Sequence, residues 1–109
     1  MDLERAQESL QAAELCLQQG LVNSAASRAY YALFQAAHVA MHIAGFAQGE
    51  WSHSGLQAAF ASELIRRRKI YPAVFREYLS AGLRTRHIAD YGLAGVSQKT
   101  ALRLVRRAA

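Results

Sequence analysis

The stretch Arg86-His87-Ile88-Ala89-Asp90-Tyr91 brings a guanidinium, a carboxylate and a phenol together within about two helical turns. In a helix, Arg86 and Asp90 are four residues apart and share a face, with Tyr91 one position further round. A guanidinium and a phenol so placed can meet one phosphate group, and the carboxylate can orient the arginine. The alternative is a solvated helix salt bridge, which stabilises a helix by only about a few tenths of a kcal/mol.

A second polar cluster is predicted on an earlier helix, whose other face is apolar. Its members recur at steps of three and four residues, so they fall in one narrow sector: Arg28, Tyr31, Gln35, His38 and His42. As a ligand site, this sector is a wall of arginine for phosphate and of rings for bases. As a structural feature, it is a seam of the bundle or an interface between subunits.

The histidines have several possible roles. His38 and His42 are four residues apart and could chelate a metal ion, but the sequence offers neither a HExxH pattern nor a cysteine pair to complete the site. We therefore expect neither a metal nor a cofactor. His53 is expected at the start of a helix, with a hydrogen bond across to the fourth helix. The basic run 66–69 is expected to favour a helix C-terminus, with RNA attraction as a secondary role.

Composition indicates a single helical domain over residues 1–109. About half of the residues are apolar and there is one proline, which favours packed helices over disorder or strands. A chain of 109 residues buries one core, and dimerisation would add to its stability. The net charge of +5, carried mostly by arginine, suits an anionic partner or simply keeps the protein soluble.

Cysteine usage and hydropathy bear on the compartment. Cys16 has no second cysteine to pair with and is expected to be a buried thiol. The N-terminal residues are charged, and no apolar run approaches the ~20 residues of a membrane span. We therefore expect a cytoplasmic protein without membrane contact.

The apolar pattern predicts an antiparallel pair of helices at the start of the chain. The first runs from about residue 2 to residue 19 and is ended by Gly20. The second is capped by Asn23 or Ser24, reaches Ala44 and is ended by Gly45. The short connection between them requires an αα-hairpin.

Three more helices are predicted after a loop in which Phe46 and Trp51 tuck onto the bundle. The third runs over about residues 54–69, and the fourth begins at Pro72, turns Val74 inward among other apolar residues and ends near residue 91. Ser97 caps a short final helix. The predicted fold is all-α, an antiparallel four-helix up-and-down bundle with a short extra C-terminal helix.

Three motifs in order give the chain a family resemblance. They are the run from Ser27 to Ala37, which reads SRAYYALFQAA, then His53-Ser54-Gly55, then the R-x-x-A-D-Y stretch that starts at Arg86. In this order they resemble HEPN-domain proteins over nearly the whole chain. The resemblance implies a HEPN-like bundle. The family includes RNA-cutting toxins, nucleotide-binding partners of minimal nucleotidyltransferases, and members without known catalysis.

The sequence lacks the histidine that the resemblance to HEPN ribonucleases would lead us to expect. HEPN ribonucleases carry an arginine and a histidine with four to six residues between them, and two such motifs face each other across a dimer. Here the residue after four intervening positions from Arg86 is Tyr91. His87 projects about a quarter turn away from it. A phenol with a pKa near ~10 is a poor general base, although it can donate a hydrogen bond to a phosphate oxygen.

The resemblance implies an RNA- or nucleotide-binding protein of a prokaryotic toxin-antitoxin or defence pair, with at most a weak metal-independent endoribonuclease activity. Arg86 would engage phosphate, Asp90 would orient it, and Tyr91 would donate a hydrogen bond or be modified. The polar wall and His53 would contact the ligand. The alternative is a non-enzymatic interaction module that binds a minimal nucleotidyltransferase partner. We expect a homodimer, with a nucleotidyltransferase as the antitoxin.

Overall fold

The computed structural model describes residues 3–46, 51–67, 72 and 74–108. These residues form five α-helices and one π-helical segment, and within them there is no strand. The elements are α1 (Glu4–Gln18), α2 (Val22–Ile43), α3 (His53–Ala59), the π-helix η1 (Phe60–Arg67), α4 (Val74–Tyr91) and α5 (Gln98–Ala108). The predicted all-α bundle is confirmed.

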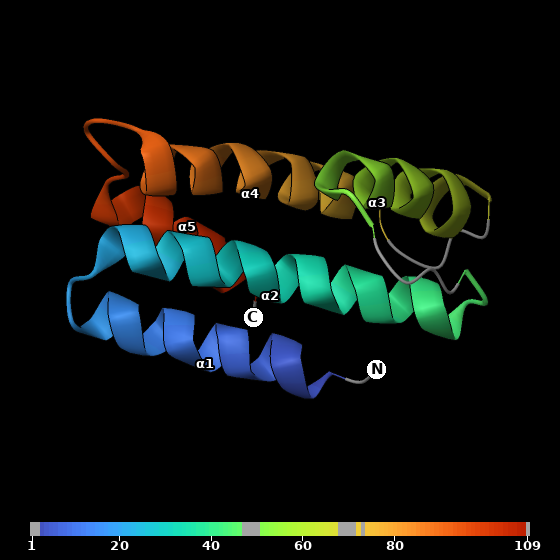
Figure 1. The fold of residues 1–109 in the computed structure, drawn as a ribbon, viewed down its shortest axis with the longest axis horizontal. Helices are drawn as coiled ribbons and strands as arrows, with labels where there is room; N and C mark the ends of the chain where they lie inside the picture. The colour runs from blue at the N-terminus through green and yellow to red at the C-terminus, as the bar shows by residue number, and fades with distance from the viewer. Residues whose placement is uncertain (1–2, 47–50, 68–71, 73, 109) are drawn as a thin grey trace.

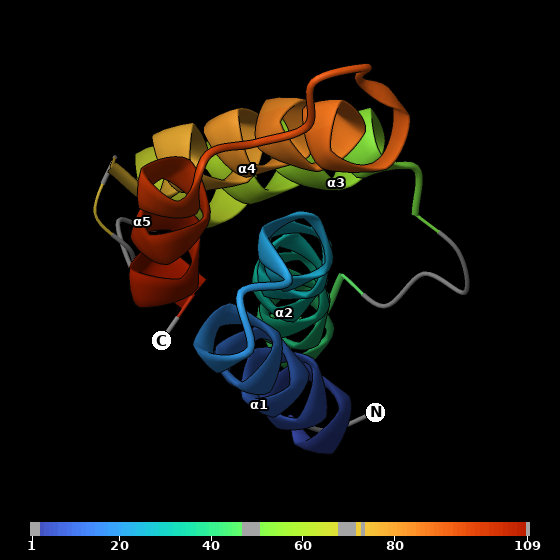
Figure 2. The same cartoon turned by 90° about the vertical axis from the view of Figure 1, so that its left-hand side faces the viewer.

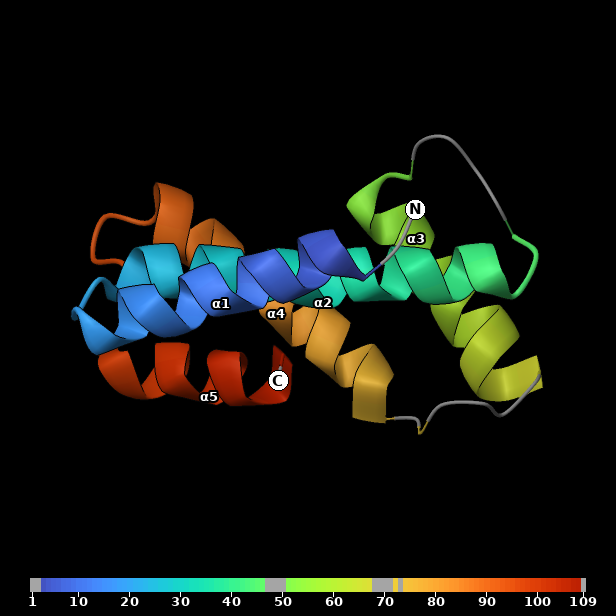
Figure 3. The same cartoon turned by 90° about the horizontal axis from the view of Figure 1, so that it is seen from below.

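Helix α2 is the axis around which the other elements pack. Figure 1 shows α1 along one side of α2 and α4 along the other, with α1 and α4 both antiparallel to it. Figure 2, a view along the bundle, places α5 and α3 on opposite sides of the space between α2 and α4. Seen from below in Figure 3, α5 lies along the N-terminal half of α2, whereas α3 and η1 lie along its C-terminal half.

The glycine stops predicted for α1 and α2 are present. Gly20 has φ +75° and Gly45 has φ +96°, a left-handed backbone that glycine adopts without a steric penalty. After α1, the N–H of Leu21 donates to the carbonyl of Cys16 at 2.8 Å, and after α2 the N–H of Phe46 donates to Met41 at 2.9 Å. Both ends are therefore closed by the hydrogen bonds typical of glycine C-caps.

Two predicted helix starts are wrong. Helix α2 begins at Val22 without a side-chain cap, because the Oδ1 of Asn23 accepts the N–H of Val96 at 2.8 Å from the connection between α4 and α5. Pro72 lies outside α4, which begins at Val74, and Val74 is exposed rather than turned inward. The predicted cap of α5 is correct, since the hydroxyl of Ser97 accepts the N–H of Thr100 at 3.1 Å.

The third helix also differs from its prediction, because only its first two turns are α-helical. It starts at His53, capped by Ser52, and continues as the wider π-helix η1 from Phe60. Residues 68 and 69 of the predicted helix, the end of the basic run 66–69, residue 2 of the first helix and residues 47–50 of the loop lie outside the described part of the chain.

The core has two parts, both built on α2. One surrounds Tyr30 and contains Ala13, Ala29 and Leu104, which places α1, α2 and α5 in contact. The other contains Met41, Leu56, Phe60, Leu64 and Leu79, and Phe46 and Trp51 pack against it as predicted. Cys16, predicted as a buried thiol, is half-buried and packs against the first part. No described helix combines the length and apolar character of a membrane span.

Candidate functional site

Arg86 and Asp90 come together on α4 as their spacing predicts, but they do not form a solvated surface bridge. Nε of Arg86 lies 2.9 Å from Oδ2 of Asp90, and the two side chains are only 14% and 29% exposed. The pair is close in distance, yet the buried Nε–H does not satisfy hydrogen-bond geometry toward any described group. The contact is therefore an ion pair that leaves this arginine nitrogen without an aligned acceptor.

Helix α2 supplies the second contact of Arg86. Its Nη2 donates to the hydroxyl of Tyr31 at 2.9 Å, and its guanidinium carbon lies 5.3 Å from the centre of the Tyr31 ring. The ring of Tyr91 lies 5.8 Å from the same carbon, while Arg28 sits 4.8 Å from the Tyr31 ring. Two guanidinium groups thus share one aromatic neighbour, an arrangement that cation–π attraction stabilises.

Asp90 is held from α2 as well. The hydroxyl of Ser27, which is buried, donates to Oδ2 of Asp90 at 3.4 Å. Ser27 and Tyr31 are four residues apart on α2 and face the same part of α4. The carboxylate and the guanidinium therefore each have one partner across the interface between α2 and α4, which fixes their mutual orientation.

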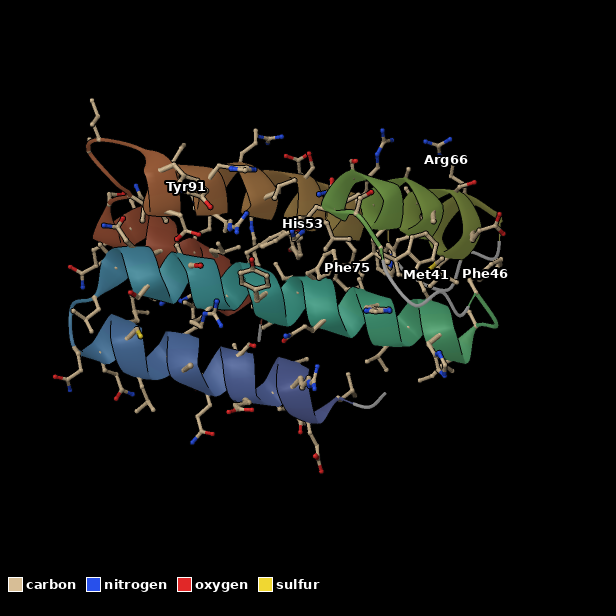
Figure 4. The ribbon with its side chains drawn as sticks, viewed as in Figure 1. Met41, Phe46, His53, Arg66, Phe75 and Tyr91 are labelled. Carbon is tan, nitrogen blue, oxygen red and sulfur yellow. The ribbon has the colours of Figure 1, made fainter. Side chains whose placement is uncertain are left out.

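His53 lies at the first position of α3, where the hydroxyl of Ser52 caps the helix by accepting the N–H of Gly55 at 2.9 Å. Its hydrogen bond goes to α2 and not to α4 as predicted: Nδ1 lies 2.7 Å from the hydroxyl of Tyr30. The imidazole ring packs 4.5 Å from Phe34 and 6.2 Å from Tyr31, measured between ring centres. Figure 4 shows His53 at the start of α3, with Tyr91 at the end of α4.

The protonation state of this pair follows from its burial. Burial raises the pKa of Tyr30 to about 12, so the phenol keeps its proton and donates it to Nδ1 of His53. Burial, and then the charges of Arg86 and His87, lower the pKa of His53, so its imidazole is neutral at neutral pH. With Nδ1 accepting, the ring proton resides on Nε2, which makes this nitrogen a hydrogen-bond donor.

The side chains of the predicted polar cluster on α2 do not form one continuous surface, because they have different neighbours. Tyr31 turns to α4, whereas the amide of Gln35 hydrogen-bonds the hydroxyl of Ser9 on α1 at 2.7 Å. His38 packs edge to face with Phe34 at 6.5 Å, and His42 is exposed in the last turn of α2. The structure therefore brings Arg28 and Tyr31 to Arg86, makes Gln35 part of a bundle seam, and places His42 away from the site.

The sequence does not predict the roles of Ser27 and Tyr30 in the site. Both residues lie within the first motif, on α2, but their hydrogen-bonding partners Asp90 and His53 are far away along the chain. Among the described residues, no three of the His, Cys, Asp and Glu side chains form a group that could hold a metal ion.

A basic groove lies on α5. A volume of about 530 Å³ is lined by Tyr78 of α4 and by residues of α5, among them Lys99, Arg103, Arg106 and Arg107. Arg107 lies 4.9 Å from the centre of the Tyr78 ring. None of the residues that line this groove contacts Arg86 or His53 in the described interactions, and Figure 3 shows α5 and α3 on opposite sides of α2.

Comparison with known proteins shows the family of this chain. The model of the HEPN domain matches residues 2–109. An UPF0332 protein of Gloeobacter violaceus is 31% identical to this chain, in a match that covers 98% of this chain and 84% of the relative. The family model spans α2, the start of α3 and the end of α4, which carry the site. This chain belongs to the HEPN-domain family.

Proposed function

We propose that this chain binds RNA or a nucleotide through a phosphate group at Arg86, as one member of a prokaryotic toxin-antitoxin or defence pair. Membership in the HEPN family supports a role connected with RNA or nucleotides at the coarse level. The observation that supports phosphate binding at Arg86 is that two helices hold its side chain, α4 through Asp90 and α2 through the hydroxyl of Tyr31.

A guanidinium group held in this way is suited to phosphate binding. Because two of its three nitrogens are already oriented by Asp90 and Tyr31, the guanidinium loses little conformational freedom when it meets an anion. Arg28 adds a second cation beside the same Tyr31 ring. Tyr91, which is 72% exposed, presents a ring on which a base can stack.

The site supports binding better than rapid cleavage. The position at which the family's ribonucleases carry histidine is held by Tyr91, a poor base near neutral pH. His53 does not replace it as a base in its neutral form, because Nδ1 accepts from Tyr30 and Nε2 carries the proton. A donor at Nε2 can stabilise phosphate charge, which leaves at most a weak metal-independent endoribonuclease.

The test compares two arginines of one helix. Arg84→Ala removes an exposed arginine of α4 that pairs with Glu77, whereas Arg86→Ala removes the same charge two residues later. We expect binding of labelled single-stranded RNA or of a nucleotide, measured by fluorescence anisotropy, to weaken at least about tenfold in Arg86→Ala, the loss of about 1.4 kcal/mol or more. Arg84→Ala should bind like the natural chain.

Equal affinities of the two variants would refute a specific role of Arg86. Cleavage is followed in the same samples with EDTA present. The natural chain should cut slowly or not at all, and Tyr91→His should raise the rate because its imidazole titrates near the working pH. Rapid cleavage by the natural chain that Arg86→Ala abolishes would make this protein an enzyme and contradict the binding proposal.

A second candidate function rests on exposed apolar side chains beside the site. Ile88, Tyr91 and Leu93 are all exposed at the end of α4, where a partner protein could cover them. In this alternative the chain is a non-enzymatic module that binds a minimal nucleotidyltransferase. Co-purification with such a partner from the neighbouring gene, lost in Leu93→Ser and kept in Arg86→Ala, would favour the alternative.

A further inference from the structure

Access to Arg86 is narrow. Its side chain is 14% exposed and lies between Asp90 and the rings of Tyr31 and Tyr91. An internal phosphodiester carries a nucleotide on each side, so it needs an open groove along which both can continue. A terminal phosphate has one substituent and three free oxygens, so it can enter a recess from one direction.

The charged and titratable groups around Arg86 and His53 come from α4 and α2. From α4 come Arg86, Asp90 and His87, and from α2 come Arg28 and the neutral phenols of Tyr30 and Tyr31. His87 is exposed and acts on His53 only through its charge. The groups that contact one another directly are two guanidinium groups and one carboxylate, and with His53 neutral they carry a net charge of +1. That charge balances a phosphodiester, which is a monoanion, but not a phosphate monoester, which is close to a dianion above its second pKa of about 6.

His53 can supply the missing charge because its hydrogen-bonding partner accommodates both protonation states. In the neutral ring, Nδ1 accepts the proton of the Tyr30 hydroxyl. In the imidazolium, Nδ1–H would donate to the phenol oxygen, and the hydroxyl proton would rotate away. The side-chain amide of Gln57 lies next to this phenol and, against the larger effect of burial, lowers the pKa of Tyr30, as a donor to the phenol oxygen does. Turned over, the same amide would present its carbonyl oxygen and accept the rotated hydroxyl proton.

We propose, on the basis of the proposed phosphate-binding function, that the site selects a terminal phosphate monoester over an internal phosphodiester, and that His53 recognises it by taking up a proton on binding. The ligand class is therefore a nucleotide or an RNA end bearing a phosphate. Arg86 and the protonated His53 meet the phosphate oxygens, while Tyr30 positions the imidazole.

The proposal predicts a specific pH dependence. In the free chain His53 is neutral above neutral pH, so the bound complex carries one proton more than the separate partners. The dissociation constant for an RNA with a phosphorylated end should therefore rise by up to tenfold for each pH unit between about pH 7 and pH 9. The same RNA with hydroxyl ends should show no such rise, because its internal phosphates need no added proton.

The experiment uses one short single-stranded RNA with 5′-phosphate, 3′-phosphate or only hydroxyl ends, and adenosine monophosphate as the nucleotide probe. Anisotropy or calorimetry gives the dissociation constants across the pH range. Calorimetry in two buffers of different ionisation enthalpy gives the protons taken up. We expect about one proton per phosphorylated ligand and a preference of at least about tenfold for phosphorylated over hydroxyl ends near pH 7.

Variants test whether His53, and not another residue, causes the pH dependence and the ligand preference. His53→Gln should lose both the pH dependence and most of the preference, whereas His42→Gln, which removes an exposed imidazole away from the site, should keep both. Tyr30→Phe retains the ring and should change the pH profile while the chain stays folded by circular dichroism. A pH profile unchanged in a folded His53→Gln variant would overturn the role of His53.

The outcomes also distinguish this inference from the proposed function. Equal binding of phosphorylated and hydroxyl-ended RNA, still lost in Arg86→Ala, would overturn the selectivity and leave phosphate binding at Arg86 standing. Absence of binding to every RNA and to the nucleotide would overturn both. Preference for only one of the RNA ends or for the free nucleotide would support the selectivity and name the source of the phosphate.

Discussion

At the scale of single residues, the adjacent Tyr30 and Tyr31 of α2 form hydrogen bonds to two different partners. They are adjacent, so they project about 100° apart on the helix, and their hydroxyls reach different elements. Tyr31 holds Arg86 of α4, whereas Tyr30 holds His53 of α3. Their rings lie 5.8 Å apart in an edge-to-face contact, so the two hydrogen-bonded groups share one aromatic support.

The pKa of His53 predicts how stability varies with pH. The pKa is lowered from 6.5 in the folded chain, so the unfolded chain binds more protons as the pH falls below about 6.5. The free energy of unfolding should therefore decrease with falling pH from about pH 7 to about pH 5, and less steeply in His53→Gln. Urea unfolding at several pH values measures this, and an identical decrease in the variant would show that His53 is not the group responsible.

At the scale of the elements, α4 approaches α2 closely at Gly82. A Cβ placed there would lie 3.1 Å from Cδ1 of Tyr30 and 3.5 Å from Cδ1 of Leu104, so this glycine lets α4 pack against α2 and α5. Alanine is the better helix former by about 1 kcal/mol. The Tyr30 ring is fully buried and hydrogen-bonded to His53, so it has little freedom to move away from an added methyl group.

Gly82→Ala should therefore destabilise the chain, by about 1 kcal/mol after the gain in helix propensity is subtracted from the penalty of overpacking. The loss should be smaller in the presence of Tyr30→Phe, which frees the ring from its hydrogen bond. Thermal or urea unfolding of the two single variants and the double variant gives the coupling. A Gly82→Ala variant more stable than the natural chain would show that the ring yields easily.

Local chemistry made the helix ends and the ion pair of α4 predictable. Gly20, Gly45 and Ser97 act through neighbours a few residues away, and Arg86 and Asp90 through the helical repeat. Asn23 failed as a predicted cap because its side chain bonds Val96, a contact across 73 residues. The partners of Tyr30 and Tyr31 were beyond reach for the same reason, since packing rather than spacing brings α3 and α4 to α2.

At the scale of the whole molecule, apolar surface remains at the end of the bundle that carries the site. Ile88 and Tyr91 of α4 and Leu93 after it are exposed, and a small domain gains stability when such surface is covered. We predict that two copies associate. Light scattering at micromolar concentration should give twice the 12.0 kDa of one chain, and Leu93→Ser should weaken the association. A mass of 12.0 kDa at every concentration would contradict dimerisation.

Nuclear magnetic resonance can show directly whether a phosphate ligand binds at Arg86 and His53. The natural chain, labelled with ¹⁵N, is titrated with single-stranded RNA or adenosine monophosphate while arginine Nε–Hε and imidazole signals are followed. We expect the signals of Arg86 and His53 to shift in proportion to the fraction of the chain that has bound the ligand. The signals of Arg103 and Arg106 in the α5 groove should stay nearly unchanged. Shifts confined to the α5 arginines, with Arg86 and His53 unaffected, would contradict this expectation and would assign binding to the basic groove.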